Sequence, residues 1–200
     1  MLIIALILNI ILIGLELMVL ISIKGKRNIL KYYTYLQNFL SLITSLIFSL
    51  CLIFCLSSKK SIPEFIKGLR YVSTCGLLAT SFIFLIFLRK ENKNVITQDD
   101  LLFNFNPKLA NIILHYLSPL LSLVSLVFFE QVIILTNGIW TALVAIPSCL
   151  YWLVYLILSA SKKWDEPYEF STKNKFIEVL TFILIPISFI VISIILWNII

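Results

Sequence analysis

Six long apolar runs constrain the fold of this chain more than any other feature of its sequence. A helix that crosses a bilayer takes roughly 20 apolar residues. Runs of about that length cover residues 2–22, 33–57, 71–88, 110–129, 138–160 and 177–197. Only short connections are left between them. The sequence therefore predicts an all-α integral membrane bundle of about six transmembrane helices, in one domain over residues 1–200.

Composition agrees with lipid as the solvent and excludes several kinds of function. Hydrophobic residues make up 60% of the chain and charged residues 13%, whereas about a quarter of an ordinary soluble domain is charged. The net charge is +6, and the basic residues that give rise to it lie between the apolar runs, so we expect no nucleic acid partner. With one histidine and no CxxC motif, we expect neither a metal site nor another cofactor. The expected partners are membrane lipids, and no pattern indicates an oligomeric state.

The distribution of basic residues predicts the orientation in the membrane. The first, third and fifth gaps between the runs hold twelve Lys and Arg, the second gap holds four, and the fourth gap and both tails hold none. Because cytoplasmic loops are enriched in Lys and Arg, the odd gaps are predicted to face the cytoplasm. A cell membrane protein with both termini outside follows.

Polar residues inside the runs recur at helical spacing, which predicts that they face the interior of the bundle. The stripes are Asn9 and Glu16; Thr34, Asn38, Ser41, Ser45 and Ser49; Asn111, His115, Ser118, Ser122 and Ser125; and Thr141, Ser148, Trp152, Tyr155 and Ser159. For most of the serines, close helix packing explains the pattern sufficiently.

Two ionisable residues within these stripes are candidates for chemistry. His115, the only histidine, can act as a general base near neutral pH, or it can be a hydrogen-bonded structural residue. Glu16 is a secondary candidate, which could pair with His115 or carry a proton. Thr34 and His115 each lie near the start of helices that enter from the same side, so we expect them in one leaflet. Tyr155 and Glu16 should come within range there. A hydroxyl beside a histidine base is the minimum for an activated nucleophile.

Two short blocks resemble the androgen-induced membrane hydrolase family and its bacterial multi-pass relatives. The blocks are Tyr33-Thr34-Tyr35-Leu36-Gln37-Asn38-Phe39-Leu40 and Leu114-His115-Tyr116-Leu117-Ser118-Pro119, and the resemblance continues at Trp140, Pro147, Trp164, Pro167 and Tyr168. It covers roughly residues 30 to 170. One departure is Ser125, which stands where bacterial relatives often carry an acidic residue.

The resemblance implies a fold of six helices and hydrolysis of fatty acid esters of hydroxy fatty acids, with Thr34 as nucleophile and His115 as base. Gln37, Asn38 and Tyr116 are then candidate oxyanion donors. The alternative hypothesis is a non-catalytic membrane protein, either lipid-binding or an assembly subunit. A small-solute transporter is a third hypothesis, but intramembrane charges and glycines are scarce for one.

Overall fold

Helices account for almost all regular structure in the computed structural model. It describes residues 1–23, 32–58, 61–85, 101–103, 105–130, 137–161 and 175–200. In this part, the isolated bridge between Ile23 and Leu101 is the one pairing outside helices. The elements are α1 (Leu2–Ser22), α3 (Tyr33–Ser58), α4 (Glu64–Ile83), α5 (Pro107–Ile112), η4 (Ile113–Leu117), α6 (Ser118–Val124), η5 (Ser125–Phe129), α7 (Ile139–Leu143), α8 (Ala145–Ala160) and α9 (Lys175–Trp197).

Four helical segments are long and apolar enough to cross a membrane. They are Leu2–Ser22, Tyr33–Ser58, Pro107–Phe129 and Ile139–Leu158. The all-helical prediction is confirmed in the described part of the chain, but the count of about six crossings is not. α4 carries Lys67 and Arg70 near its start, and the apolar stretch found in α9 is the shorter Ile183–Trp197.

The helical segments of the described part begin and end within three residues of the predicted apolar runs, except in the third run. That run was expected over 71–88; α4 begins earlier, at Glu64, and ends at Ile83, and residues 86–88 lie outside the described part of the chain. Pro63 precedes the helix and Glu64 lies in its first turn, where a negative charge is favourable. The prediction was wrong because it started the helix at its first apolar stretch. Arg70 therefore lies within the helix, not in a loop.

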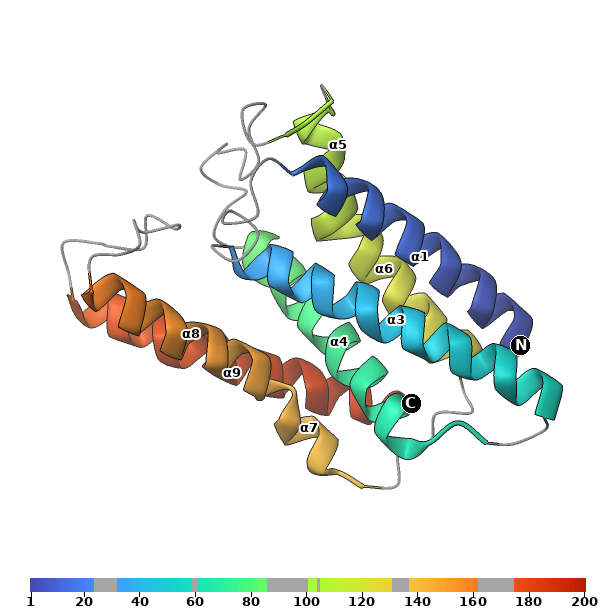
Figure 1. Cartoon of the computed structure of the whole chain (residues 1–200). Helices are drawn as coiled ribbons and strands as arrows, with labels where there is room; N and C mark the ends of the chain where they lie inside the picture. The colour runs from blue at the N-terminus through green and yellow to red at the C-terminus, as the bar shows by residue number, and fades with distance from the viewer. Residues whose placement is uncertain (24–31, 59–60, 86–100, 104, 131–136, 162–174) are drawn as a thin grey trace.

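α4 is the central helix of the bundle (Figure 1). It packs against α3 and α6 on one side and against α7 and α9 on the other, while α1 packs on α3 and α6. α8 and α9 run side by side, and the two chain termini lie at the same end of the molecule. Both termini at one end are expected of a chain that crosses an even number of times.

Two glycines allow the close approach of helices to α4. A Cβ at Gly76 would collide with the side-chain amide of Gln37 on α3, and a Cβ at Gly68 would collide with the indole of Trp140 on α7. Small residues at such crossings are typical of membrane helices, where packing itself holds the helices together.

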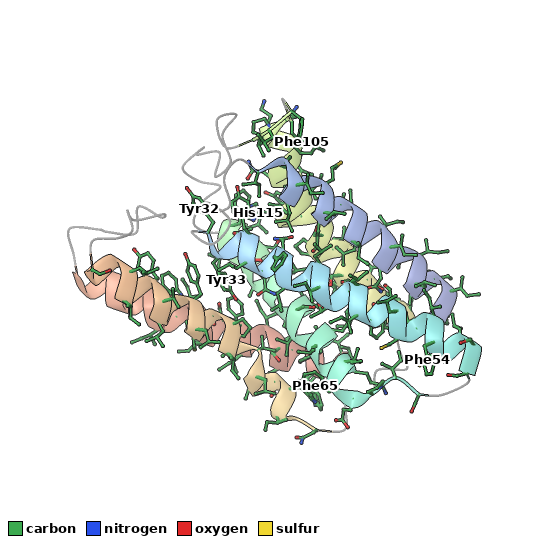
Figure 2. The ribbon with its side chains drawn as sticks, in the orientation of Figure 1. Tyr32, Tyr33, Phe54, Phe65, Phe105 and His115 are labelled. Atoms are coloured by element: carbon green, nitrogen blue, oxygen red, sulfur yellow. The ribbon has the colours of Figure 1, made fainter. Side chains whose placement is uncertain are left out.

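The surface and interior of the bundle have the polarity expected in lipid. Large apolar side chains point outward along the helices (Figure 2), among them Ile7 on α1, Leu50 on α3 and Leu153 on α8, each more than half exposed. The polar stripes of α1, α3 and the α5–η5 segment are buried, as the sequence predicted. Water is a poor solvent for such an exterior, so the chain is a membrane protein.

Candidate functional site

The backbone around His115 is shaped by the proline four residues later. Pro119 has no N–H, so the His115 carbonyl loses its usual helical donor. The Ser81 hydroxyl of α4 donates to that carbonyl at 2.6 Å. The N–H of Ser118 reaches back to the carbonyl of Ile113, which makes the turn a π-helix. Pro119 and Ser81 together fix the backbone from which the imidazole projects.

The imidazole of His115 is buried and keeps its hydrogen-bonding capacity. The side chain is 1% exposed and stacks on Phe84, with ring centroids 3.8 Å apart and an interplanar angle of 11°. Among the described residues, neither Nδ1 nor Nε2 has a hydrogen-bond partner. A buried polar atom without a partner costs about 1–3 kcal/mol. Both nitrogens are therefore available to a group that enters the interior.

Thr34 lies in the same half of the bundle as His115. The Gln37 amide donates to the Ser73 carbonyl at 3.1 Å and touches Gly76. Ser81, which bonds to His115, is five residues beyond Gly76, or about 7.5 Å along α4. Thr34 is almost one turn before Gln37 on the antiparallel α3, toward the same end. Figure 2 likewise draws His115 at the end of the bundle where α3 begins.

No hydrogen bond joins Thr34 to His115. The imidazole nitrogens bond to nothing in the described part of the chain, and Thr34, which is 7% exposed, uses its carbonyl to accept the Asn38 amide at 2.9 Å. The expected contact between the hydroxyl and the ring stays a prediction for the substrate complex, because catalytic hydrogen bonds often tighten only there.

The two candidate amides for an oxyanion are partly committed to the fold. Gln37 donates to Ser73 and accepts from the Tyr33 hydroxyl at 3.2 Å. Asn38 donates to Thr34, and its carbonyl oxygen is unpartnered within the described structure. An amide nitrogen has two hydrogens, so each residue can offer one more donor to an oxyanion.

The two tyrosines proposed for the site make aromatic contacts, and Tyr116 shares one of them with His115, through Phe84. Tyr116 is 38% exposed and packs edge-on against Phe84, with centroids 5.9 Å apart. Tyr155 belongs to an aromatic cluster with Trp152 and Tyr151, and Tyr151 in turn contacts Tyr33. The pocket was expected between the second, fourth and fifth helices. In the structure the His115 ring packs on Phe84 and its turn contacts α1 and α4, while the fifth helix, α8, contacts α3, so a pocket shared by all three helices stays a prediction.

A buried ion pair was missed by the sequence analysis. Arg70 and Glu130 are both fully buried, and Nη2 of Arg70 lies 3.2 Å from Oε1 of Glu130. Nη1 of Arg70 donates to the hydroxyls of Thr74 and Ser122 at 3.0 and 2.7 Å. Every nitrogen of the guanidinium thus has an acceptor.

Glu130 ends the π-helical turn η5 and gathers three elements around one oxygen. Oε1 accepts from Asn9 on α1 at 2.8 Å, from Ser125 at 2.5 Å and from Arg70. The i→i+5 bond from Glu130 N–H to the Ser125 carbonyl brings these two residues together. The carboxylate of Glu130 therefore lies against the Ser125 hydroxyl. The sequence held one sign that Arg70 lies within a helix: Thr74, a polar residue four positions later, would share its helix face.

Glu16 is fully buried on α1, and neither oxygen of its carboxyl has a hydrogen-bond partner among the described residues. The pairing of Glu16 with His115 that the sequence allowed is not formed, because the nitrogens of His115 have no partner among the residues described.

The remaining expectations concern metals and relatives. The described residues contain no group of three His, Cys, Asp or Glu side chains that could hold a metal ion. Trp164, Pro167 and Tyr168 of the resemblance lie outside the described residues, as does the side chain of Ser159. No protein-family model, curated protein or solved structure matches this chain.

Proposed function

We propose that the protein is an intramembrane hydrolase of lipid esters, with Thr34 as nucleophile and His115 as base. The observation that carries the proposal is the His115 imidazole, which is buried inside a membrane bundle with both nitrogens uncommitted in the described structure. Ionisable groups at such positions are costly and usually functional. The motif resemblance supplies the reaction, and the placement of Thr34 in the same half of the bundle supports it.

The reaction proceeds in two steps. The Thr34 hydroxyl attacks the ester carbonyl while His115 takes its proton, and the proton is then given to the leaving alcohol as the C–O bond breaks. A water molecule attacks the acyl-threonine, again with His115 as base, and releases the fatty acid with Thr34 restored. The remaining N–H groups of Gln37 and Asn38 are the donors proposed for the oxyanion.

The proposal includes six crossings of the cell membrane, with both termini outside. α4 is enclosed by α3, α6, α7 and α9 and presents little surface to lipid, so it needs less hydrophobicity than a peripheral helix. Its arginine is neutralised by Glu130. With Arg70 counted in the membrane, the predicted cytoplasmic side keeps twelve basic residues and the other side three.

The test is hydrolysis of a fluorogenic medium-chain ester and a branched fatty acid ester by the purified full-length protein in detergent. Thr34→Ala and His115→Ala should each lower the rate by about 10²-fold or more, since each removes a reacting group. Ser188→Ala is the matched control, because that hydroxyl donates to its own helix at 2.6 Å. Full activity of Thr34→Ala would remove the nucleophile assignment.

A second measurement separates the hydrolase from the non-catalytic alternative. A lipid-like fluorophosphonate should label the protein at Thr34, and His115→Ala should suppress the labelling without unfolding the protein. Absence of labelling together with absence of hydrolysis on both esters would favour the lipid-binding or assembly subunit.

A further inference from the structure

The end of α4 contacts both the backbone and the ring of His115. Ser81 donates to the His115 carbonyl at 2.6 Å. Phe84 is three residues after Ser81, so it lies on the same side of the helix. Its ring lies flat against the imidazole, with centroids 3.8 Å apart and planes 11° from parallel. The end of α4 therefore fixes both the point from which the imidazole projects and the plane in which it lies.

Phe84 is itself held in place by its surroundings. The side chain is buried, and the backbone N–H donates to the carbonyls of Ser81 and Thr80. Tyr116, the residue after His115, packs against the Phe84 ring in a T-shaped arrangement, with centroids 5.9 Å apart. A phenyl ring fixed in this way can hold the plane of the imidazole that stacks on it.

The geometry of this stack suits a charged imidazole better than a neutral one. Two neutral aromatic rings prefer an offset or edge-to-face arrangement, because their negative faces repel each other. The rings of Phe84 and His115 are nearly parallel, and 3.8 Å between centroids leaves room for only a small offset. A cation over a phenyl face is attracted by the quadrupole of the ring, and more strongly where water is excluded. The contact should therefore become stronger when His115 takes up a proton.

A histidine base usually has a third group behind it. In hydrolases this group is most often a carboxylate at the other ring nitrogen, which orients the imidazole and stabilises the imidazolium. Within the described part of the chain, neither nitrogen of His115 has such a partner. The face of Phe84 can perform both tasks, because it fixes the ring plane and attracts the positive charge. It also leaves both nitrogens free at the edge of the imidazole.

We propose that Phe84 is a positioning residue of the hydrolase site, which orients His115 and stabilises the imidazolium formed when His115 takes the proton of Thr34. This inference rests on the proposed function, since the imidazolium forms in that reaction. The contact is stronger in the transition state than in the ground state, so its loss should lower kcat and leave KM nearly unchanged.

The stack itself can be tested without a substrate. His115 is the only histidine, so the full-length protein in detergent, labelled with ¹³C at the histidine Cε1 and purified without a histidine tag, gives one ring signal. The ring current of Phe84 should shift the proton on Cε1 upfield, and Phe84→Leu should move it downfield. Phe82→Leu is the matched control, because Phe82 is two residues away and 51% exposed. An unchanged signal in Phe84→Leu would overturn the proposal, whether or not the protein hydrolyses esters.

Hydrolysis of the fluorogenic ester tests the role of the stack. Phe84→Leu should lower kcat about tenfold and change KM by less than about twofold. Phe84→Tyr retains the aromatic face and should restore most of kcat, and Phe82→Leu should change neither constant. Phe84→pentafluorophenylalanine retains the stacked ring but reverses the charge of its face, so it should also lower kcat.

The outcomes separate this proposal from the hydrolase itself. Full kcat in Phe84→Leu or in Phe84→pentafluorophenylalanine would overturn the role of Phe84 and leave the hydrolase standing. A shifted ring signal in Phe84→Leu, without hydrolysis by the unchanged protein, would overturn the proposed function and the catalytic role of the stack together.

Discussion

The guanidinium of Arg70 and the carboxylate of Glu130 are sixty residues apart in the chain and 3.2 Å apart in the fold. Because Asn9 donates to the same carboxylate oxygen, this pair joins α1, α4 and the end of η5. The linkage is polar, whereas the outer surface of the same helices is apolar. It therefore provides specific geometry in a solvent where apolar contacts alone distinguish poorly between helix pairings.

Replacing one partner of this pair should lower the free energy of unfolding more than replacing both partners. Arg70→Met and Glu130→Met should each destabilise the fold by about 3–5 kcal/mol, because each leaves one buried charge unpaired. The double variant should be closer in stability to the unchanged protein. Thermal unfolding in detergent measures all three, and additive losses would contradict a coupled pair.

Thr34 and His115 should behave as one unit in hydrolysis. The double variant Thr34→Ala/His115→Ala should be about as inactive as either single variant, since residues that act together fail together. Thr34→Ser should keep part of the activity, because the hydroxyl remains. His115→Gln should fold and not turn over, because an amide cannot accept and return the proton. If the rate of the double variant fell by the product of the two single losses, the shared mechanism would be contradicted.

Ser81 should support His115 through its backbone. Ser81→Ala leaves the His115 carbonyl without its donor, which we expect to cost about 1–3 kcal/mol. Hydrolysis should fall as well, since the ring would no longer be held in place. Ser188→Ala removes a hydroxyl of the same kind from α9 and should change neither quantity. Equal unfolding temperatures for the two variants would argue against the contact.

Gly76 should tolerate no side chain. Gly76→Ala should destabilise the fold by about 1–3 kcal/mol, because the added methyl meets the Gln37 amide, which is held by Ser73 and Tyr33. Gly14→Ala is the matched control, since a Cβ there meets nothing within 4 Å. That change should be neutral or stabilising by about 0.5–1 kcal/mol. The unfolding midpoints of the two variants, compared with that of the unchanged protein, test this prediction.

Single-cysteine labelling should reveal the orientation. In a variant without the four native cysteines, Asn137→Cys should react with an impermeant thiol reagent in intact cells, and Val95→Cys should react only after lysis. Residue 95, like the loops near 26 and 170, lies outside the described part of the structure. Labelling of position 95 from outside would reverse the orientation and leave the helices unchanged.

Periodicity predicted the interior of this bundle better than it predicted its contacts. The stripe from Asn9 to Glu16 and the stripe from Thr34 to Ser49 are buried because spacing on a helix determines which residues share a face. Spacing says nothing of which helix that face meets. The aromatic contacts of Tyr155 with Tyr151 and Trp152 could therefore not be predicted from spacing. Arg70 was misplaced for another reason, since hydropathy treats every arginine as a boundary and takes no account of a counter-ion sixty residues later.

The distance between Arg70 and Glu130 along the chain also has a consequence for biogenesis. When α4 leaves the ribosome, its arginine has no counter-ion, and under the proposal of six crossings an unpaired arginine within this helix opposes its insertion. The compensating acid is synthesised sixty residues later, after the whole α5–η5 segment. Under the proposal of six crossings, α4 is therefore stable in the membrane only after that segment has been inserted. A chain interrupted before Glu130 would expose the helix to quality control, so the ion pair makes stable insertion of the first half depend on synthesis reaching the second.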